Sequence, residues 1–166
     1  KTHILFDLDG TLTDSAPGIL NALRESLQKM HIKPHPDQRH LAFIGPPLEE
    51  PFKTLYGLDD KKTEQAITFY REYYQTKGYK ESGLFPGVES MLEGLRKKGK
   101  RLIIATGKSA VVAERILAHF GIADHFCLIR GKGSYKDVVT KAELIGKILE
   151  DARINPQHAV MIGDRG

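Results

Sequence analysis

The stretch His3-Ile4-Leu5-Phe6-Asp7-Leu8-Asp9-Gly10-Thr11-Leu12 decides the fold class of this 166-residue chain. An apolar run ends in two carboxylates, Asp7 and Asp9, and a glycine follows at once. Side chains two positions apart in a strand share a face, so these carboxylates lie close together unless the backbone turns between them. Neighbouring carboxylates repel, and a metal ion, a shared proton or a cation relieves the repulsion. The pattern predicts a site at a strand end rather than a plain Asp-Gly hairpin turn, because no second alternating strand follows Thr11.

Short apolar runs elsewhere in the chain predict more strands. The predicted strands are residues 2–6, 101–105, 125–129 and 159–162. They do not alternate with polar residues, which is typical of strands covered on both faces. Helical patterns at 109–120 and 140–152 separate the last three strands. This order predicts an α/β fold with a doubly wound parallel sheet.

Residues 15–85 have a different pattern, in which no good strand is found. A helix is predicted to begin at Asp14 or Ser15, with Pro17 in its first turn. A second helix is predicted from about Asp60, and its apolar stripe is more typical of a subdomain core than of a ligand site. The stripe consists of Ile67, Tyr70, Tyr73 and Tyr74. We therefore expect a sheet domain of residues 1–14 and 86–166, interrupted by an all-helical insertion of residues 15–85.

Composition narrows the possible partners and the compartment. The net charge is +4, but the basic residues are scattered, so nucleic acid is not expected as a partner. No apolar run is long enough to span a membrane, and residues 1–15 lack a secretion-signal pattern. The single cysteine, Cys127, excludes a disulfide within the chain and a cysteine metal site. We expect a cytoplasmic protein without a membrane partner.

Three further motifs place polar residues where strands end or helices begin. Thr106-Gly107 follows a strand and precedes a helix, where unpaired backbone N–H groups favour phosphate; capping by Thr106 or Ser109 is the alternative. Thr140-Lys141-Ala142-Glu143 is a capping box that starts a helix. A lysine in the first turn interacts unfavourably with the helix dipole, so an anion nearby would explain Lys141. A solvated loop charge is the alternative. Gly163-Asp164 ends the last predicted strand, where a plain turn is the alternative.

The run from Asp7 to Ser15, DLDGTLTDS, resembles the first signature of the haloacid dehalogenase superfamily, especially its phosphoglycolate phosphatase-like and nucleotidase-like branches. Thr106 and Asp164 resemble residues of its second and fourth motifs. The third motif supplies a lysine, for which Lys141 is our choice and Lys136 the reserve. The resemblance implies a Rossmann-like core domain with a helical cap at 15–85, in which residues 45–48 form the substrate-selective loop.

The resemblance also implies a chemistry, the magnesium-dependent hydrolysis of a small phosphorylated metabolite through an aspartyl phosphate. Asp7 would be the nucleophile, and Asp9 would protonate the leaving oxygen and then activate water. The phosphate ligands would be Gly10, Thr106, Gly107 and Lys141. The Mg²⁺ ligands would be Asp7, the main-chain carbonyl of Asp9, and Asp164. A residue that protonates the leaving group suits the cleavage of a phosphate ester, whereas a halide leaves without a proton. The presence of Asp9 therefore argues against dehalogenation.

The sequence departs from the family pattern near its end. A second acid is expected about four residues after Asp164, but the sequence stops at Gly166. We therefore expect a fragment, or the ordered part of a longer chain, in which the C-terminal part of the sheet domain is absent. A phosphosugar mutase, a receiver-like signalling module and a phosphate-binding fold without catalysis remain alternatives. Phosphoglycolate, a nucleoside monophosphate and a sugar phosphate all remain possible substrates, and the choice between monomer and dimer stays open.

Overall fold

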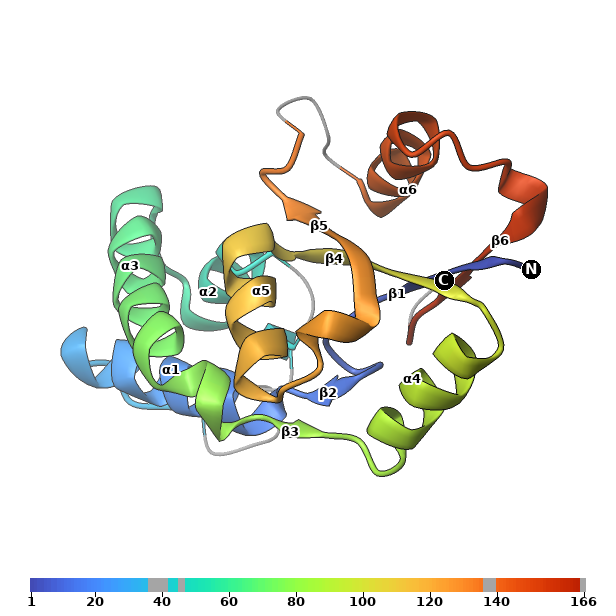
Figure 1. Cartoon of the computed structure of the whole chain (residues 1–166). Coiled ribbons are helices and arrows are strands. Elements are labelled where there is room, and N and C mark those ends of the chain that lie inside the picture. Colours follow the sequence, from blue (N-terminus) through green and yellow to red (C-terminus); the bar gives the residue numbers. More distant parts are fainter. Residues whose placement is uncertain (36–41, 45–46, 136–139, 165–166) are drawn as a thin grey trace. The chain divides into compact units, whose positions relative to one another are not determined.

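A computed structural model describes residues 1–35, 42–44, 47–135 and 140–164 (Figure 1). The chain divides into two compact units. The sheet unit comprises Lys1–Asp14 and Leu84–Gly166, and the helical unit comprises Ser15–Gly83. The sequence interpretation placed the second boundary two residues later, after residue 85.

Four parallel strands form the centre of the sheet unit. They are β1 (His3–Phe6), β4 (Arg101–Ser109), β5 (Phe126–Lys132) and β6 (Ala159–Ile162), in the order β5-β4-β1-β6. The four predicted strands are confirmed, but β4 continues four residues beyond the predicted end at residue 105. Its register against β5 shifts between Thr106 and Ser109, so this added part is irregular. The carboxyl ends of all four strands lie at one edge of the sheet.

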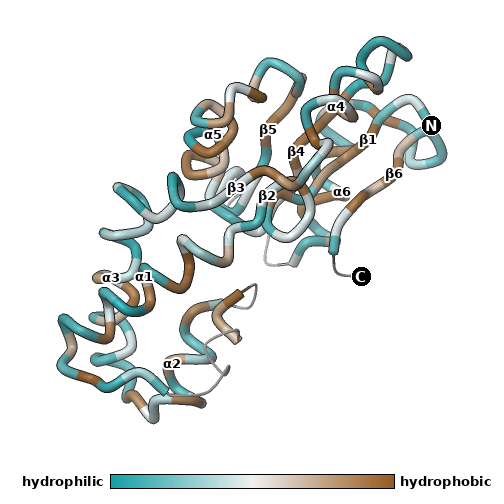
Figure 2. Tube along the Cα trace, turned by 90° about the horizontal axis from the view of Figure 1, so that it is seen from below, coloured by the Kyte–Doolittle hydropathy of each residue, from teal (hydrophilic) through white to brown (hydrophobic). Residues whose placement is uncertain are grey.

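Three helices cover the sheet, namely α4 (Val88–Lys97), α5 (Ala110–His119) and α6 (Lys141–Asp151). The chain moves outward from β1 to β4 and β5 through α4 and α5, and α6 then returns it to β6 on the other side of β1. Because such crossovers are right-handed, α4 and α5 cover one face and α6 the other (Figures 1 and 2). The predicted α/β fold with a doubly wound sheet is confirmed. Short 3-10 turns, η3 (Ala123–His125) and η4 (Pro156–His158), precede β5 and β6.

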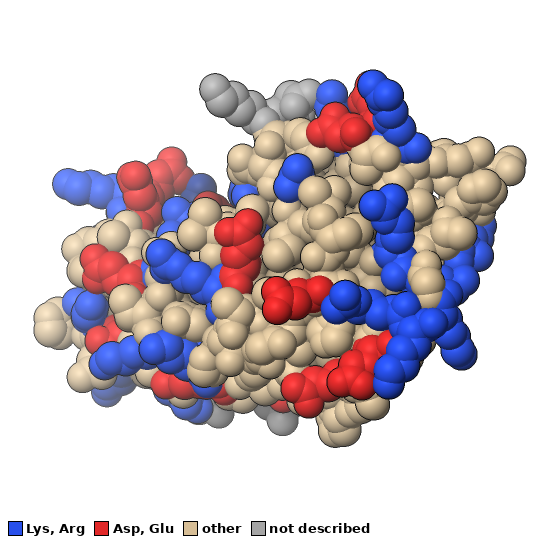
Figure 3. All heavy atoms as spheres, in the orientation of Figure 1, with Lys and Arg blue, Asp and Glu red and all other residues tan. Residues whose placement is uncertain are grey.

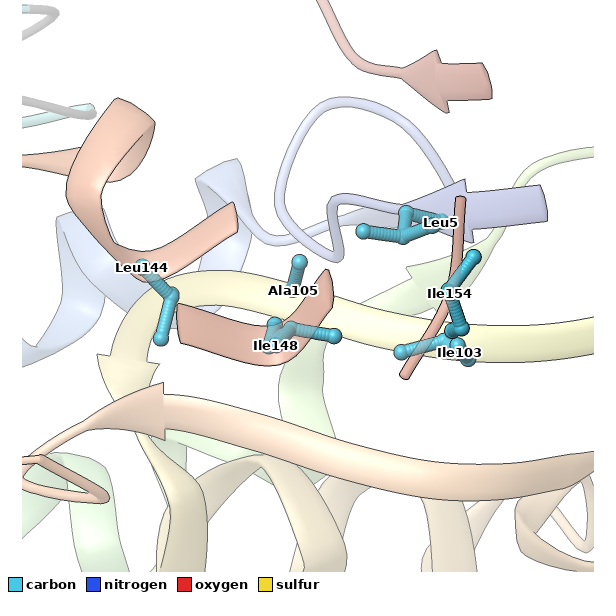
Figure 4. Packing of buried hydrophobic residues seen from close by; sticks show 6 residues of the cluster. All are labelled: Leu5, Ile103, Ala105, Leu144, Ile148 and Ile154. Carbon is cyan, nitrogen blue, oxygen red and sulfur yellow. The ribbon is translucent and has the colours of Figure 1, made fainter. Parts of the chain in front are cut away.

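Packing against the sheet fixes the position of α6. Side chains of α6, of the segment that follows it and of the sheet pack together in one buried cluster (Figure 4). The cluster consists of Leu5, Ile103, Ala105, Leu144, Ile148 and Ile154. Each large aliphatic side chain stabilises this arrangement by roughly 1.5–3 kcal/mol through burial. The cluster therefore holds the first residue of α6, Lys141, in a defined position relative to β1.

The helical unit contains α1 (Ala16–Lys29), α2 (Glu49–Tyr56), α3 (Asp60–Thr76) and the 3-10 turn η2 (Gly78–Glu81). The prediction that residues 15–85 hold no strand is wrong at one place, because β3 (Gly83–Leu84) pairs with β2 (Thr13–Asp14). Ser15 occupies the cap position of α1 as predicted, although its side chain makes no capping hydrogen bond. Asp59 does cap α3, where its carboxylate accepts from the Lys62 N–H at 2.8 Å.

Buried contacts join α1 to its neighbours within the helical unit. The Ser26 hydroxyl donates to the Ala66 carbonyl of α3 at 2.7 Å. A Cβ on Gly18 would overlap the carbonyl of Gly78, so α1 and η2 approach too closely for any side chain there. Two tyrosines of the predicted stripe, Tyr70 and Tyr74, are buried and stacked, with ring centroids 5.9 Å apart. The stripe therefore belongs to the core of this unit.

The surface carries charges of both signs. On the face shown in Figure 3, lysine and arginine side chains are interspersed with aspartate and glutamate. None of the helices within the described residues is long and apolar enough to span a membrane.

Candidate active site

A tight turn follows β1 and shapes the first part of the site. The Asp7 N–H donates to the Ile162 carbonyl at 2.9 Å, which places Asp7 beside the end of β6. The Leu8 carbonyl then accepts from the N–H groups of Leu12 and Thr13, both at 3.0 Å. The backbone thus turns after Leu8, in the segment that carries Asp9.

Gly10 is required by this turn in two ways. Its φ angle is +73°, in the left-handed region that other residues rarely adopt. A Cβ there would also lie 2.6 Å from the Oδ2 atom of Asp164. The carboxylate of Asp164, which follows β6, therefore lies against the backbone of the turn that carries Asp9.

Lys141 forms an ion pair with Asp7, through its Nζ and the Oδ2 of the carboxylate. The predicted capping box holds Lys141 at the start of α6: the Glu143 N–H donates to the Thr140 hydroxyl at 3.2 Å, and the Thr140 N–H donates to the Glu143 carboxylate at 2.8 Å. The Asp7 side chain is 15% exposed. Its charge explains why a cation is tolerated in the first turn of a helix. Lys136, the reserve choice, lies outside the described residues.

A second ion pair, which the sequence analysis missed, joins Lys108 to Asp9. Its Nζ and the Oδ2 of Asp9 are 3.0 Å apart, and the side chains are only 15% and 20% exposed. The available signal was the place of Lys108, two residues after Thr106 at a predicted strand end. Each carboxylate of the first motif thus has its own lysine.

Thr106 and Ser109 have different roles in the segment that carries Lys108. The Ser109 hydroxyl caps α5 by accepting from the Val112 N–H at 3.4 Å, so helix capping is correct for Ser109. Thr106 is 1% exposed, and its hydroxyl accepts from the Lys108 N–H at 3.3 Å. Gly107 has no described atom within 4 Å of the position of a Cβ, so space does not require a glycine there.

The predicted donor set suits a hard divalent cation such as Mg²⁺. It consists of two carboxylates, Asp7 and Asp164, and the main-chain carbonyl of Asp9, all of them oxygen donors. Within the described ranges no three His, Cys, Asp or Glu side chains form a metal-binding group, so this set depends on the main-chain oxygen. Asp7 pairs with Lys141 and Asp9 with Lys108, so with Asp164 the site has three carboxylates, two lysines and one formal negative charge. The Oδ1 of Asp9 is also buried without a hydrogen-bond partner among the described residues.

Comparison with known proteins identifies the family of this chain. The profile of the haloacid dehalogenase-like hydrolases matches residues 4–166, and the chain belongs to this family. The 5'-nucleotidase of Pseudomonas aeruginosa is 39% identical over 98% of this chain and 74% of its own length. The tyrosine-protein kinase PtkA of Mycobacterium tuberculosis is 40% identical over 98% of this chain, which spans only 55% of that protein.

A solved structure has the same fold. The haloacid dehalogenase-like hydrolase of Streptococcus pneumoniae superimposes with a TM-score of 0.88 at 36% identity, covering 98% of this chain and 75% of that one. The predicted family is therefore confirmed, and with it the prediction of a hydrolytic enzyme.

Proposed function

We propose that this chain is a magnesium-dependent phosphatase that hydrolyses small phosphomonoesters through an aspartyl phosphate. One observation carries the proposal: Asp7 and Asp9 lie at the carboxyl end of one strand, each paired with a different lysine. Separate partners allow two carboxylates to do different work, one as a nucleophile and the other as an acid and base. Membership of a hydrolase family and similarity to a 5'-nucleotidase support the same conclusion.

In the first step, an oxygen of Asp7 attacks the phosphorus. The bond between phosphorus and the ester oxygen breaks, and Asp9 gives that oxygen a proton, so an alcohol leaves. The ammonium group of Lys141 lies beside the Asp7 carboxylate and stabilises negative charge on the phosphoryl oxygens. Gly10, Thr106 and Gly107 hold these oxygens at the same edge of the sheet.

In the second step, Asp9 takes a proton from water, and the water oxygen attacks the phosphorus of the aspartyl phosphate. The bond to Asp7 breaks, inorganic phosphate leaves, and both carboxylates return to their starting state. Asp7, the carbonyl of Asp9, and Asp164 would hold Mg²⁺. When bound, the ion would offset the charge of the phosphoryl group and reduce its repulsion from Asp7.

A nucleoside 5'-monophosphate is the first substrate to test, because the similar Pseudomonas aeruginosa protein is a 5'-nucleotidase. Phosphoglycolate and sugar phosphates are the next classes, following the family resemblance of the first motif. The helical unit would supply the selectivity for the leaving group. Within the predicted selective loop, Gly45 and Pro46 lie outside the described residues.

Transfer of the phosphoryl group to a hydroxyl acceptor instead of water is the second candidate function. The observation in its favour is the 40% identity to a tyrosine-protein kinase. The same Asp7 and Asp9 would serve, with the acceptor hydroxyl replacing water in the second step. A phosphorylated acceptor, formed at the expense of free phosphate, would support this candidate.

The deciding experiment measures phosphate release from p-nitrophenyl phosphate with Mg²⁺, and then with a chelator in its place. We expect release that the chelator abolishes and that Asp7→Asn and Asp7→Ala lower by about a thousandfold or more. Asp124→Asn is the matched control, because it makes the same chemical change at an exposed position of the sheet unit. Activity retained by both Asp7 variants would contradict the assignment of the nucleophile.

A further inference from the structure

Lys108 has no part in the two steps described above, yet it contacts the side chain on which both depend. We propose that Lys108 is a positioning residue, which fixes the carboxylate of Asp9 in the orientation that delivers a proton to the leaving oxygen. This inference rests on the proposed phosphatase function. It assigns the two lysines of the site to different carboxylates and hence to different tasks.

The ion pair has the geometry of a fixed contact. The Nζ of Lys108 lies 3.0 Å from the Oδ2 of Asp9, and both side chains are at least four-fifths buried. Screening by water is weak at such a site, so the pair is held more firmly than one on the surface. The other oxygen, Oδ1, is buried and has no hydrogen-bond partner in the described part of the chain. Lys108 thus occupies one oxygen of Asp9 and leaves the other for the proton.

The backbone is built to bring Lys108 to this place. Thr106 is paired with Gly131 and Ser109 with Lys132, so Gly107 and Lys108 are additional residues on β4. Such a bulge redirects a side chain, and bulges are frequent beside active sites. A hydrogen bond from the Lys108 N–H to the buried hydroxyl of Thr106 closes the irregular segment.

Gly131 on β5 makes room for the bulge. A Cβ at this position would overlap the carbonyl oxygen of Lys108 and lie 2.9 Å from the nitrogen of Ala110. No other residue type has space there without moving the Lys108 backbone. The sheet therefore has a glycine where β5 approaches the backbone of Lys108.

The proposed role has a chemical signature that a phosphate-binding role lacks. When the ester bond breaks, a strongly basic leaving oxygen needs the proton of Asp9, whereas the weakly basic oxygen of p-nitrophenol leaves without it. A misplaced Asp9 therefore slows cleavage of esters with basic leaving groups and spares the others. A residue that binds the phosphoryl group would affect all esters alike, because that group is common to them.

The test compares p-nitrophenyl phosphate with phenyl phosphate in the unchanged chain and in Lys108→Gln. We measure kcat/KM, which reports the steps up to formation of the aspartyl phosphate. We expect Lys108→Gln to lower kcat/KM by about 10- to 100-fold for phenyl phosphate and by less than about threefold for p-nitrophenyl phosphate. Lys108→Arg should restore part of the loss, because it keeps the charge. Lys132→Gln, which removes an exposed lysine from the neighbouring strand, should change neither value.

Each other outcome would overturn the inference. An equal loss on both esters with a raised KM would place Lys108 on the phosphoryl group, and no loss on either would remove its role. Gly131→Ala leaves Lys108 in the chain but displaces its backbone, so it should reproduce the loss specific to phenyl phosphate; thermal melting confirms that each variant is folded. Failure of the proposed function would look different, since the unchanged chain would then release phosphate from neither ester.

Discussion

Ion pairs of the same residue types differ sharply between the two units. In the sheet unit, Lys108 and Asp9 have side chains that are 15% and 20% exposed. In the helical unit, Lys53 and Asp60 are 2.6 Å apart, but their side chains are 48% and 94% exposed. An exposed pair contributes little because water screens it and the side chains move, whereas a buried pair keeps its geometry. Burial, and not residue type or distance, thus separates a pair suited to chemistry from an ordinary surface pair.

The helical unit also has a feature of a different kind. It is a hollow of about 220 Å³, lined mainly by apolar side chains together with Arg24, His35 and Tyr56. Its apolar lining consists of Leu20, Leu23 and Leu27 of α1 together with Pro34. The helical unit thus has a partly apolar hollow, and the sheet unit has two ion pairs of low exposure.

Removing one lysine from each unit tests the comparison most strongly. Lys141→Gln should lower kcat/KM for p-nitrophenyl phosphate by about 10²- to 10³-fold, because it deletes a cation that stabilises developing charge. Lys62→Gln, an exposed position on α3, should leave the rate unchanged. Steady-state phosphate release checks both variants. Similar losses in the two would break the distinction between the units.

Core truncations compare the stability of the units. Ile148→Ala in α6 and Leu27→Ala in α1 each remove a side chain that is 0% exposed. Each change should cost about 2–5 kcal/mol of unfolding free energy. Ile148→Ala should also reduce turnover of the folded protein, because α6 positions Lys141, whereas Leu27→Ala should spare p-nitrophenyl phosphate hydrolysis. Urea unfolding measures the loss of stability, and kcat/KM at low urea measures the turnover of the folded protein. An equal loss of turnover in Ile148→Ala and Leu27→Ala would contradict the separate roles of the two units.

The smallest expected effect concerns the far end of β1, opposite the site. Burial lowers the pKa of His3 below its usual value of 6.5, and the charges of Arg101 and His158 lower it further. The unfolded chain therefore binds this proton first as the pH falls through about 6.5, and the fold loses stability. His3→Gln should remove this loss, which we expect to be under about 2 °C in Tm between pH 7.5 and 5.5. Melting curves of both proteins at the two pH values measure this effect. If the Tm difference between the two pH values is the same in His3→Gln as in the unchanged chain, His3 is not its cause.

Much of the sheet unit was predictable because its signals are local. Apolar runs marked the strands, and the capping box placed Lys141 at a helix start with an unexplained charge. The contact between Lys108 and Asp9 was not predictable, because it depends on a bulge that Gly131 permits from another strand. No local sequence pattern predicts such a bulge.

The helical unit was harder to predict for a related reason. α2 is only eight residues long and contains Pro51, so its periodicity is too short to be seen. β3 is two residues long and depends on its pairing with β2. Both elements form through tertiary contacts that the local sequence does not encode.

The pairing of β1 with β6 has a consequence for how the protein acquires its activity. Asp7 and Lys141 are 134 positions apart, and Asp164 is farther still along the chain. Contacts of such separation form late, because the entropy of closing a long loop is lost before they can stabilise the fold. On a ribosome, Asp7 is synthesised well before Lys141 and Asp164. The order of synthesis thus leaves Asp7 without these partners until the residues of α6 and β6 have been added.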